Sequence, residues 1–204
     1  MNWWLNTQWL CSVFTLAYAL GSIPFGLLLA RAAGLGDPRK IGSGNIGATN
    51  VLRTSKSSKG KWVAALTLLC DAGKGVAVVM LTRYIYDDLS AYFAGFFVVL
   101  AHAFPVWLHF KGGKGVATTL GVILALDWPI GVIVCIVWLA TFYFLRISSL
   151  ASLISIGYSS IIAHLFEDER TALLCLALSA FVIFTHRGNI NRLLQGTEHI
   201  FKKE

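Results

Sequence analysis

The sequence predicts an all-α integral membrane protein with about seven transmembrane helices. Of its 204 residues, 56% are hydrophobic and only 13% are charged, whereas a typical soluble domain has roughly 25% charged residues. A helix rises about 1.5 Å per residue, so roughly 20 mostly apolar residues cross a hydrocarbon core of about 30 Å. The candidate spans lie at residues 8–33, 62–86, 90–110, 113–127, 129–146, 148–166 and 171–187.

These apolar segments leave almost no residues for a separate soluble domain, so we expect 1–204 to form a single transmembrane domain. The first segment differs from a signal peptide, because Arg31 follows the apolar run and no small-residue cleavage site is obvious. Pro24 is expected to kink this first span. The segment at 113–127 is short for a span and is also compatible with a re-entrant or partly buried helix.

The basic residues predict an orientation with the N-terminus outside and the C-terminus in the cytoplasm. If the segments alternate across the membrane, only Lys74, Arg83 and Arg170 of the 17 basic residues fall outside the inner loops, as expected from the enrichment of Lys and Arg on the cytoplasmic side. The acidic residues of the outer side are Asp87, Asp88, Asp127, Glu167, Asp168 and Glu169. The net charge of +7 therefore indicates an anionic leaflet or anionic substrates, not nucleic acid.

Three polar, glycine-containing segments, which we call the first, second and third motifs, are expected as loops on this predicted inner face. They are IGSGNIGATN at 41–50, FKGGKGVATT at 110–119 and THRGNINRLLQGTE at 185–198. Glycines let amide N–H groups point at an anion, and Lys and Arg add charge-assisted hydrogen bonds. Helices beginning just after Gly47 and Gly115 would add their positive ends. One such segment alone is equally compatible with a turn or a topology anchor, but three on one face favour a site for a phosphate-containing ligand.

These segments resemble the motifs of the bacterial membrane acyl-phosphate:glycerol-3-phosphate acyltransferases. The resemblance covers nearly the whole chain and includes GSIPFG at 21–26, DAGKG at 71–75 and HAFPVWLHFKGGKGVAT at 102–118. It implies a seven-helix enzyme that transfers an acyl chain from acyl-phosphate to the 1-hydroxyl of glycerol 3-phosphate. The products would be lysophosphatidic acid and inorganic phosphate, in the first step of phospholipid synthesis. It also implies that the motifs face the cytoplasm at the cell inner membrane.

The resemblance carries the candidate site residues. The candidate catalytic residues are Ser43, Asn45, Lys114, His186 and Asn189. The candidate substrate-binding residues are Gly42, Gly44, Thr49, Asn50, Arg53, Lys111, Gly112, Gly113, Gly115, Arg187, Arg192 and Glu198. In this scheme Ser43, Asn45 and Asn189 orient the hydroxyl or polarise the acyl carbonyl. Lys114 and Arg187, with the amides near Ser43 and from Gly112 to Gly115, bind phosphate and stabilise charge.

The group that accepts the proton stays open from the sequence. Imidazole titrates near neutrality, which makes His186 the obvious side-chain base. The acceptor's own phosphate, with a second pKa of about 6 by analogy with phosphorylated side chains, could take the proton instead while His186 binds phosphate, and we favour that route. No His is followed five positions later by Asp, the pairing of many thioester-using glycerolipid acyltransferases, which favours acyl-phosphate as the donor.

The remaining polar residues in the spans have simpler interpretations. Asp71 and Lys74 share one face of a predicted membrane helix, and we interpret them as a mutually neutralised structural pair, although intramembrane charges are often functional. His102 and His109 have no partners spaced to complete a metal site. We expect no metal or cofactor, the two substrates and membrane lipid as partners, and a functional monomer.

The main alternative is a membrane transporter for a phosphorylated metabolite. Such a protein would also use broken helices and basic residues to hold phosphate, but its site would lie near the midplane between repeated halves. Here the predicted donors lie at one surface, and no internal repeat is visible. Only Asp71 and Lys74 would support a midplane site, so the sequence favours the enzyme.

Overall fold

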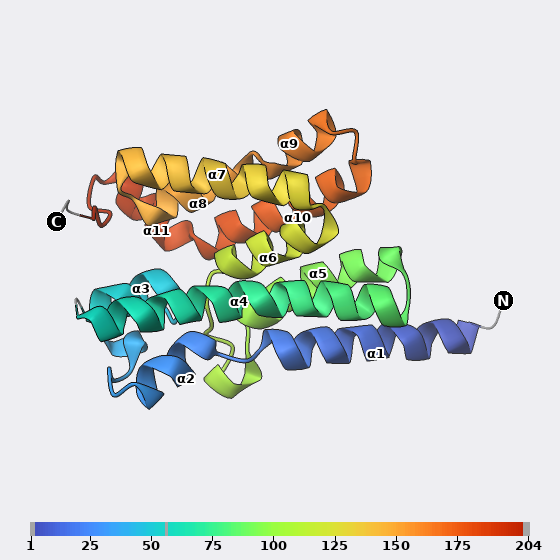
Figure 1. Ribbon diagram of the computed structural model, residues 1–204, viewed down its shortest axis with the longest axis horizontal. Helices are drawn as coiled ribbons and strands as arrows, with labels where there is room; N and C mark the ends of the chain where they lie inside the picture. The colour runs from blue at the N-terminus through green and yellow to red at the C-terminus, as the bar shows by residue number, and fades with distance from the viewer. Residues whose placement is uncertain (1–2, 56, 202–204) are drawn as a thin grey trace. The chain divides into compact units, whose positions relative to one another are not determined.

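The computed structural model describes residues 3–55 and 57–201, and this part of the chain is helical and contains no strand (Figure 1). The all-α prediction is therefore confirmed for the described residues. The helices fall into two compact units, one ending at Val122 and the other beginning at Ile123.

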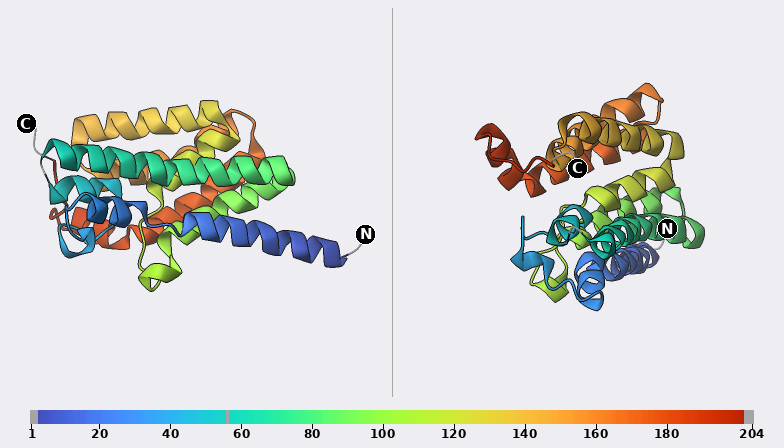
Figure 2. Two further views of the ribbon diagram at one scale, coloured as in Figure 1. Left: turned by 60° about the horizontal axis from the view of Figure 1, so that its bottom comes forward. Right: turned by 60° about the vertical axis from the view of Figure 1, so that its left-hand side comes forward.

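The first unit is built around the long helix α4. Its elements are α1 (Trp3–Gly21), α2 (Phe25–Ala32), η1 (Pro38–Lys40), α3 (Ala48–Thr54), α4 (Ser58–Ile85), α5 (Asp88–Ala103), η2 (Val106–Leu108) and most of α6 (Val116–Leu126), where η marks a 3-10 helix. Helix α5 packs against α1 and α4, while α2 and α3 pack against α4 (Figures 1 and 2). The buried residues Ala30, Val51, Val63 and Ala64 form the core where α2, α3 and α4 meet.

The first span is broken where the sequence predicts a kink. Helix α1 ends at Gly21 and α2 begins at Phe25, so Pro24 lies directly before the second helix. Proline lacks a backbone N–H and its ring clashes with the preceding turn, which interrupts the helical hydrogen bonds. The bend therefore follows from the local sequence, and it leaves the carbonyl of Ile23 available for partners from other helices.

The second unit begins with the last turn of α6. Its helices are α7 (Trp128–Leu145), α8 (Ser148–Gly157), α9 (Ser159–Leu165), α10 (Glu169–Thr185) and α11 (Arg187–Leu194). Helix α8 packs against α7 and α10, and α9 packs against α10. Helices α7 and α10 begin after Asp127 and Asp168, whose carboxylates accept the amides of Ile130 and Thr171. This is the usual N-cap arrangement, and it fixes where each apolar segment becomes helical.

Five segments are long and apolar enough to cross a membrane by length and composition. They are Cys11–Ala32, Ser58–Ile85, Asp88–Leu108, Trp128–Leu145 and Ser148–Leu165. Helices α10 and α11, bent by 65°, would give a sixth if they count together. Helix α6 has 11 residues, or about 16 Å at about 1.5 Å per residue, roughly half of a hydrocarbon core. Among the described residues the structure thus supports five or six spans, and seven alternating spans stay a prediction.

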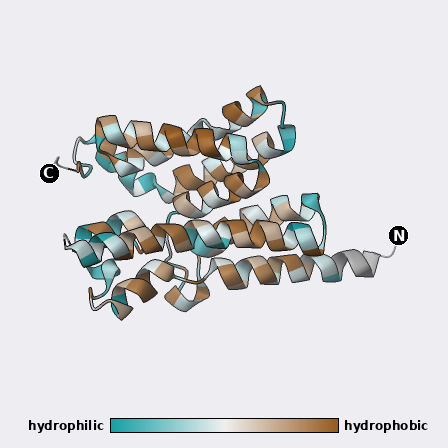
Figure 3. Ribbon diagram, viewed as in Figure 1, coloured by the Kyte–Doolittle hydropathy of each residue, from teal (hydrophilic) through white to brown (hydrophobic). Residues whose placement is uncertain are grey.

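Helix α7 has the surface of a lipid-facing helix. Figure 3 shows hydrophobic colouring along most of its length. Its side chains Ile136, Leu139 and Phe144 are exposed at 57, 60 and 76%. A helix that is apolar on all sides is suited to a membrane. The chain is an integral membrane protein of helical fold.

The third polar motif was expected to be a loop, and this expectation is wrong. Most of it forms the helix α11, which follows α10 after a bend at His186. A loop was expected because glycine and polar residues, which are typical of loops, are frequent in this segment. However, Gly188 is itself exposed, and Ile190 and Leu193 are half-buried three residues apart on one face. This spacing is a helical pattern within a polar segment.

Candidate active site

The first motif forms a tight loop before α3. Helix α3 begins at Ala48 and α6 at Val116, so the helix starts predicted after the motif glycines are confirmed. Gly42 and Gly44 adopt φ values of +61° and +70°, which glycine reaches without steric cost. A Cβ atom added to Gly42 would also overlap the side-chain oxygen of Asn50. These glycines are therefore required by the shape of the loop itself.

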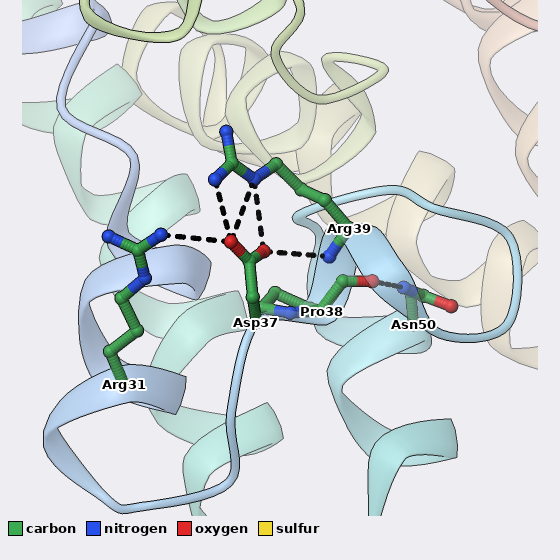
Figure 4. Close-up of polar contacts among 5 residues, drawn as sticks. All are labelled: Arg31, Asp37, Pro38, Arg39 and Asn50. Atoms are coloured by element: carbon green, nitrogen blue, oxygen red, sulfur yellow. Dashed lines mark hydrogen bonds and ion pairs between the residues drawn. The ribbon is translucent and has the colours of Figure 1, made fainter.

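Asn50 holds this loop from the inside. The residue is only 2% exposed. Its Nδ2 lies 2.7 Å from the carbonyl oxygen of Pro38, 3.0 Å from that of Ile41 and 2.8 Å from that of Asn45. Its Oδ1 accepts the backbone amide of Ser43 at 2.9 Å. Figure 4 shows the bond to Pro38. The Asn50 amide thus shapes the motif backbone, and we assign it a positioning role.

A second polar cluster lies beside this loop and was not predicted from the sequence. The Asp37 carboxylate accepts from Arg31 Nη2 at 2.9 Å and from Arg39 Nη2 at 2.6 Å, and it also caps the Arg39 backbone amide (Figure 4). Hydrogen bonds from Arg39 hold the pKa of Asp37 well below its usual range. The available signal was the Asp37 and Pro38 pair, because Asp before Pro is a typical helix start.

The second motif turns back onto the end of α5. His109 and Phe110 both have left-handed backbone conformations, with φ of 51° and 59°. After them, the amide of Gly112 donates to the carbonyl of Ala103 at 2.9 Å, and that of Gly113 donates to the carbonyl of His102 at 3.1 Å. The two glycines therefore lie directly on the last turn of α5.

Several motif amides donate within the protein. The Gly44 amide reaches the carbonyl of Ile41 at 3.1 Å, and the Ser43, Gly112 and Gly113 amides have the partners given above. The expectation that these four amides point at an anion is therefore wrong. They close tight loops instead, and each backbone N–H has only one hydrogen to donate.

Charged and polar side chains of the first two motifs lie at or near the surface of the first unit. Ser43 and Lys111 are exposed, and Thr49, Arg53 and Lys114 are half-buried. The Arg53 side chain lies next to Gly42, since a Cβ there would be 3.7 Å from Arg53 Cδ. In the first unit these side chains replace the loop amides as the candidate donors to a phosphate group.

The two motifs of the first unit lie close together. Ile46 of the first motif packs with Leu108, which lies just before the second motif, and both contact Leu27 of α2. In addition, Asn45 accepts the Gly47 amide at 2.9 Å and so closes a local turn. The contact between Ile46 and Leu108 therefore places the first motif beside the residues that lead into the second motif.

The third motif contains a buried carboxylate that orients two other side chains. Glu198 Oε1 accepts from Asn189 Nδ2 at 2.9 Å, and its Oε2 accepts from Arg192 Nε at 2.8 Å. The Glu198 side chain is only 4% exposed. Burial opposes its ionisation, but the hydrogen bonds from Asn189 and Arg192 outweigh this effect and lower the pKa of Glu198. The sequence placed Glu198 among the binding residues, whereas in the structure its carboxylate holds two side chains of α11 in place. We call this pair of hydrogen bonds the clamp on α11.

His186 lies at the bend between α10 and α11 and is 2% exposed. Its Nδ1 is 2.8 Å from the carbonyl oxygen of Val182. Because a carbonyl only accepts, Nδ1 carries the hydrogen, and in the neutral ring the lone pair lies on Nε2. The next residue, Arg187, is exposed and has its guanidinium 4.7 Å from the centre of the Phe184 ring. The structure thus brings the third-motif residues together in the second unit.

The fold and these motifs define a class of protein, a helical membrane protein with clustered basic side chains and an oriented histidine. The comparison with protein families is more specific. Residues 11–196 match the profile of the family described as glycerol-3-phosphate acyltransferase. The chain belongs to this family, as the motifs predict.

Individual relatives and solved structures agree with this assignment. A glycerol-3-phosphate acyltransferase of Jannaschia sp. (strain CCS1) is 50% identical over 183 residues, which cover 90% of this chain and 88% of the relative. A glycerol-3-phosphate acyltransferase of Mesorhizobium japonicum is also 50% identical, over 94% of this chain and 96% of the relative. The chain also resembles a crystal structure of PlsY, an integral membrane glycerol 3-phosphate acyltransferase, in its glycerol 3-phosphate form. That match has 37% sequence identity and a TM-score of 0.87, and it covers 95% of this chain and 96% of the solved structure. The lysophosphatidic acid form matches with 36% sequence identity and a TM-score of 0.85, and the match covers 95% of each chain.

Proposed function

We propose that this protein transfers an acyl chain from acyl-phosphate to the 1-hydroxyl of glycerol 3-phosphate. The products are lysophosphatidic acid and inorganic phosphate. The observation that carries the proposal is the likeness, over 95% of the chain and at 37% identity, to a structure in its glycerol 3-phosphate form. The lysophosphatidic acid form of the related structure matches the proposed product.

The chemistry of the donor explains what the protein has to supply. Acyl-phosphate is a mixed anhydride with a good leaving group, so the acceptor hydroxyl attacks the acyl carbonyl carbon without a covalent enzyme intermediate. A C–O bond to the acceptor forms, the oxyanion collapses, and the bond to phosphate breaks. Positioning of the two substrates supplies roughly 7–11 kcal/mol, and one oxyanion donor supplies about 3–4 kcal/mol.

We assign roles to the motif side chains according to their chemistry. Lys111, Lys114 and Arg53 bind phosphate, as their charge suits, with Thr49 and the backbone of the motif glycines framing them. Ser43 and Asn45 orient the acceptor hydroxyl or the acyl carbonyl. In the second unit, Asn189 is a polar donor held in place by Glu198, while Arg187 and Arg192 add positive charge.

The proton of the attacking hydroxyl has two possible acceptors, and we favour the phosphate of the acceptor itself. His186 serves in either route. As a neutral ring it offers the Nε2 lone pair, and as a cation it donates from Nε2 to phosphate, while Nδ1 keeps its bond to Val182. In the substrate-assisted route His186 binds phosphate and removal of its ring leaves residual turnover.

We further propose that residues 1–204 act as one transmembrane acyltransferase domain in the cell inner membrane, as a monomer without metal or organic cofactor. The family match supports a single domain, because it extends through both units. Seven spans, with the short helix α6 as one of them, would place the motifs in the cytoplasm, the N-terminus outside and the C-terminus inside. Positive-inside charge supports this orientation.

The proposal is tested with purified protein in lipid vesicles. Palmitoyl-phosphate and palmitoyl-CoA are offered as parallel donors with glycerol 3-phosphate, and lysophosphatidic acid is measured for each. We expect product from palmitoyl-phosphate alone, and Ser43→Ala should reduce it strongly. Product from palmitoyl-CoA would contradict the donor assignment. Binding of glycerol 3-phosphate without product from either donor would favour a transporter of phosphorylated metabolites.

A further inference from the structure

A cluster of buried ionisable residues lies between α4 and α5, outside the three polar motifs. Lys74 Nζ is 3.1 Å from Asp71 Oδ1, and His102 Nδ1 is 3.5 Å from the same oxygen. The side chains are 3 to 5% exposed. Burying charges this deeply is unfavourable unless each has partners in good geometry. The cluster therefore has a defined arrangement that loss of one member would disturb.

Lys74 connects this cluster to the break in the first span. Its ammonium donates to the carbonyl of Ile23 at 2.9 Å, in the segment where α1 has ended and α2 has not begun. Ser22 in the same segment accepts the indole N–H of Trp107 at 2.8 Å, and Trp107 lies in η2. The break, α4 and the segment leading into the second motif are thus joined through specific polar contacts.

His102 connects the cluster to the second motif. Its backbone carbonyl accepts the Gly113 amide at 3.1 Å, and the neighbouring carbonyl of Ala103 accepts the Gly112 amide at 2.9 Å. The side chain lies against the same glycine, because a Cβ atom added to Gly113 would overlap the imidazole at Nε2. One edge of the imidazole thus faces the buried carboxylate of Asp71, and the other faces the backbone of the motif.

We propose that Asp71, Lys74 and His102 are positioning residues for the second motif. The ion pair fixes the imidazole of His102, and the imidazole together with the end of α5 fixes Gly112 and Gly113. The lysines on either side of these glycines, Lys111 and Lys114, are thereby held for the phosphate of glycerol 3-phosphate, so the proposal rests on the proposed function. Asp71 and Lys74 then do more than lock one helix against its neighbours.

The first test is Asp71→Asn, which removes the charge at nearly unchanged volume. We expect the KM for glycerol 3-phosphate to rise about tenfold with kcat changed less than about twofold, because binding contacts are displaced while the reacting groups remain. Thr82→Val is the matched control. Thr82 is a fully buried polar residue on the same helix, about 16 Å further along at about 1.5 Å per residue. Its KM should equal that of the wild type.

A second readout does not depend on catalysis. Hydrogen–deuterium exchange of the peptide containing residues 109–115 reports the order of the second motif directly. Asp71→Asn should speed this exchange about tenfold, whereas Thr82→Val should leave it unchanged. Unchanged exchange in a folded Asp71→Asn protein would overturn the proposal. So would a lower thermal stability accompanied by a wild-type KM, because that pattern describes a purely structural pair.

A size-complementing pair tests the contact between His102 and Gly113. Gly113→Ala alone should raise KM, because its methyl group would collide with the imidazole. Adding His102→Ala removes that ring, so the double variant should have a lower KM than Gly113→Ala. If the double variant instead shows a KM increase equal to the product of the increases of the two single variants, the contact between His102 and Gly113 does not position the motif. This pair also keeps the proposal testable if Asp71→Asn fails to fold.

Measurements on the wild-type protein distinguish a failure of the proposed function from a failure of the positioning proposal. If the wild-type protein forms no lysophosphatidic acid, the proposed function fails, and exchange of the 109–115 peptide still decides whether the cluster orders the motif. If the wild type is active and Asp71→Asn keeps both its KM and its exchange rate, only the positioning proposal fails.

Discussion

The loop of the first motif and the helix α11 of the third motif fix their polar groups in opposite ways. In the loop, one buried amide side chain, Asn50, serves the backbone by bonding to three carbonyls and one N–H group. At α11, a buried carboxylate that lies beyond the end of the helix, Glu198, holds the helix side chains Asn189 and Arg192. The loop thus uses a side chain to shape its backbone, whereas the helix uses its regular backbone to present side chains.

This difference indicates what a substitution should do in each place. A change at Asn50 removes support from the backbone, so it should lower stability and substrate binding together. A change at Glu198 leaves α11 helical but releases two of its side chains, so it should act mainly on turnover. Preorganised donors contribute to rate only when they are held in place before the reaction.

The largest expected effect is at His186, which lies just before α11 and is 2% exposed. His186→Ala should lower kcat about 10²- to 10³-fold without abolishing it, because the acceptor phosphate can still take the proton. The rate of lysophosphatidic acid formation at saturating substrates measures this effect. Complete loss of turnover with unchanged binding of glycerol 3-phosphate would show that His186 is the base.

Glu198→Gln tests the clamp on α11. The amide retains one acceptor oxygen but turns an NH₂ group toward a donor, so Asn189 or Arg192 loses its partner. We expect kcat to fall about 10- to 100-fold, since a hydrogen bond to a charged group is worth about 1.5–3 kcal/mol.

Glu169→Gln is the control for the clamp, because Glu169 is a 72% exposed carboxylate in the same unit. It should keep wild-type turnover. Equal effects of Glu198→Gln and Glu169→Gln would contradict the assignment of Glu198 as a positioning group.

Asn50→Asp and Asn50→Ala test the loop. A carboxylate could still accept the Ser43 amide, but it cannot donate to the carbonyls of Pro38, Ile41 and Asn45. Both variants should therefore lower the free energy of unfolding by about 1–3 kcal/mol, with Asn50→Asp no better than Asn50→Ala. Thermal unfolding in detergent measures this. A near-wild-type Asn50→Asp protein would show that the donor bonds contribute little.

Acid provides a milder way to loosen the clamp. Because the pKa of Glu198 is lower in the folded protein than its ordinary value of 4.5, its contribution to stability is complete above that value. It is lost as the pH falls through the lower, folded pKa. The difference in thermal stability between the wild type and Glu198→Gln should therefore be constant at neutral pH and shrink on acidification. A difference that grows in acid would contradict the sign of the shift.

The smallest expected effect is at Asp37. Its partners Arg31 and Arg39 have side chains exposed at 56 and 37%, and ion pairs with exposed partners contribute about 0–1 kcal/mol. Asp37→Asn should change the unfolding free energy by no more than this, and the effect should shrink with added salt. A larger loss than that of Asn50→Ala would show that the arginine cluster is the main support of the loop.

Much of the fold could be predicted from local sequence. Apolar segments of membrane length become helices because every backbone polar group in lipid needs an internal partner. Pro24 marks the break in the first span, and the helix starts after Gly47 and Gly115 follow from the sequence as well. Each of these features is determined by residues that are adjacent in the chain, which is why it can be predicted from the sequence.

The site was harder to predict because its contacts join distant positions. Asn50 reaches the Pro38 carbonyl across 12 residues, and Asn189 reaches Glu198 across 9. His102 lies under Gly113 only because the chain reverses at His109 and Phe110. The sequence therefore indicates the chemical types of these residues, but it does not show which polar groups bind substrate and which hold the loops. The helix α11 is also hard to predict, because its helical spacing is short and mixed with polar residues.

The most direct test of the central claim is the ratio of two products in one reaction. Wild-type protein in vesicles is given acyl-phosphate as the sole donor together with glycerol 3-phosphate, and inorganic phosphate and lysophosphatidic acid are measured over the same time course. Acyl transfer predicts that they form in equal amounts and that phosphate release stops when glycerol 3-phosphate is omitted. Phosphate release that continues without the acceptor, or without matching lysophosphatidic acid, would contradict the account.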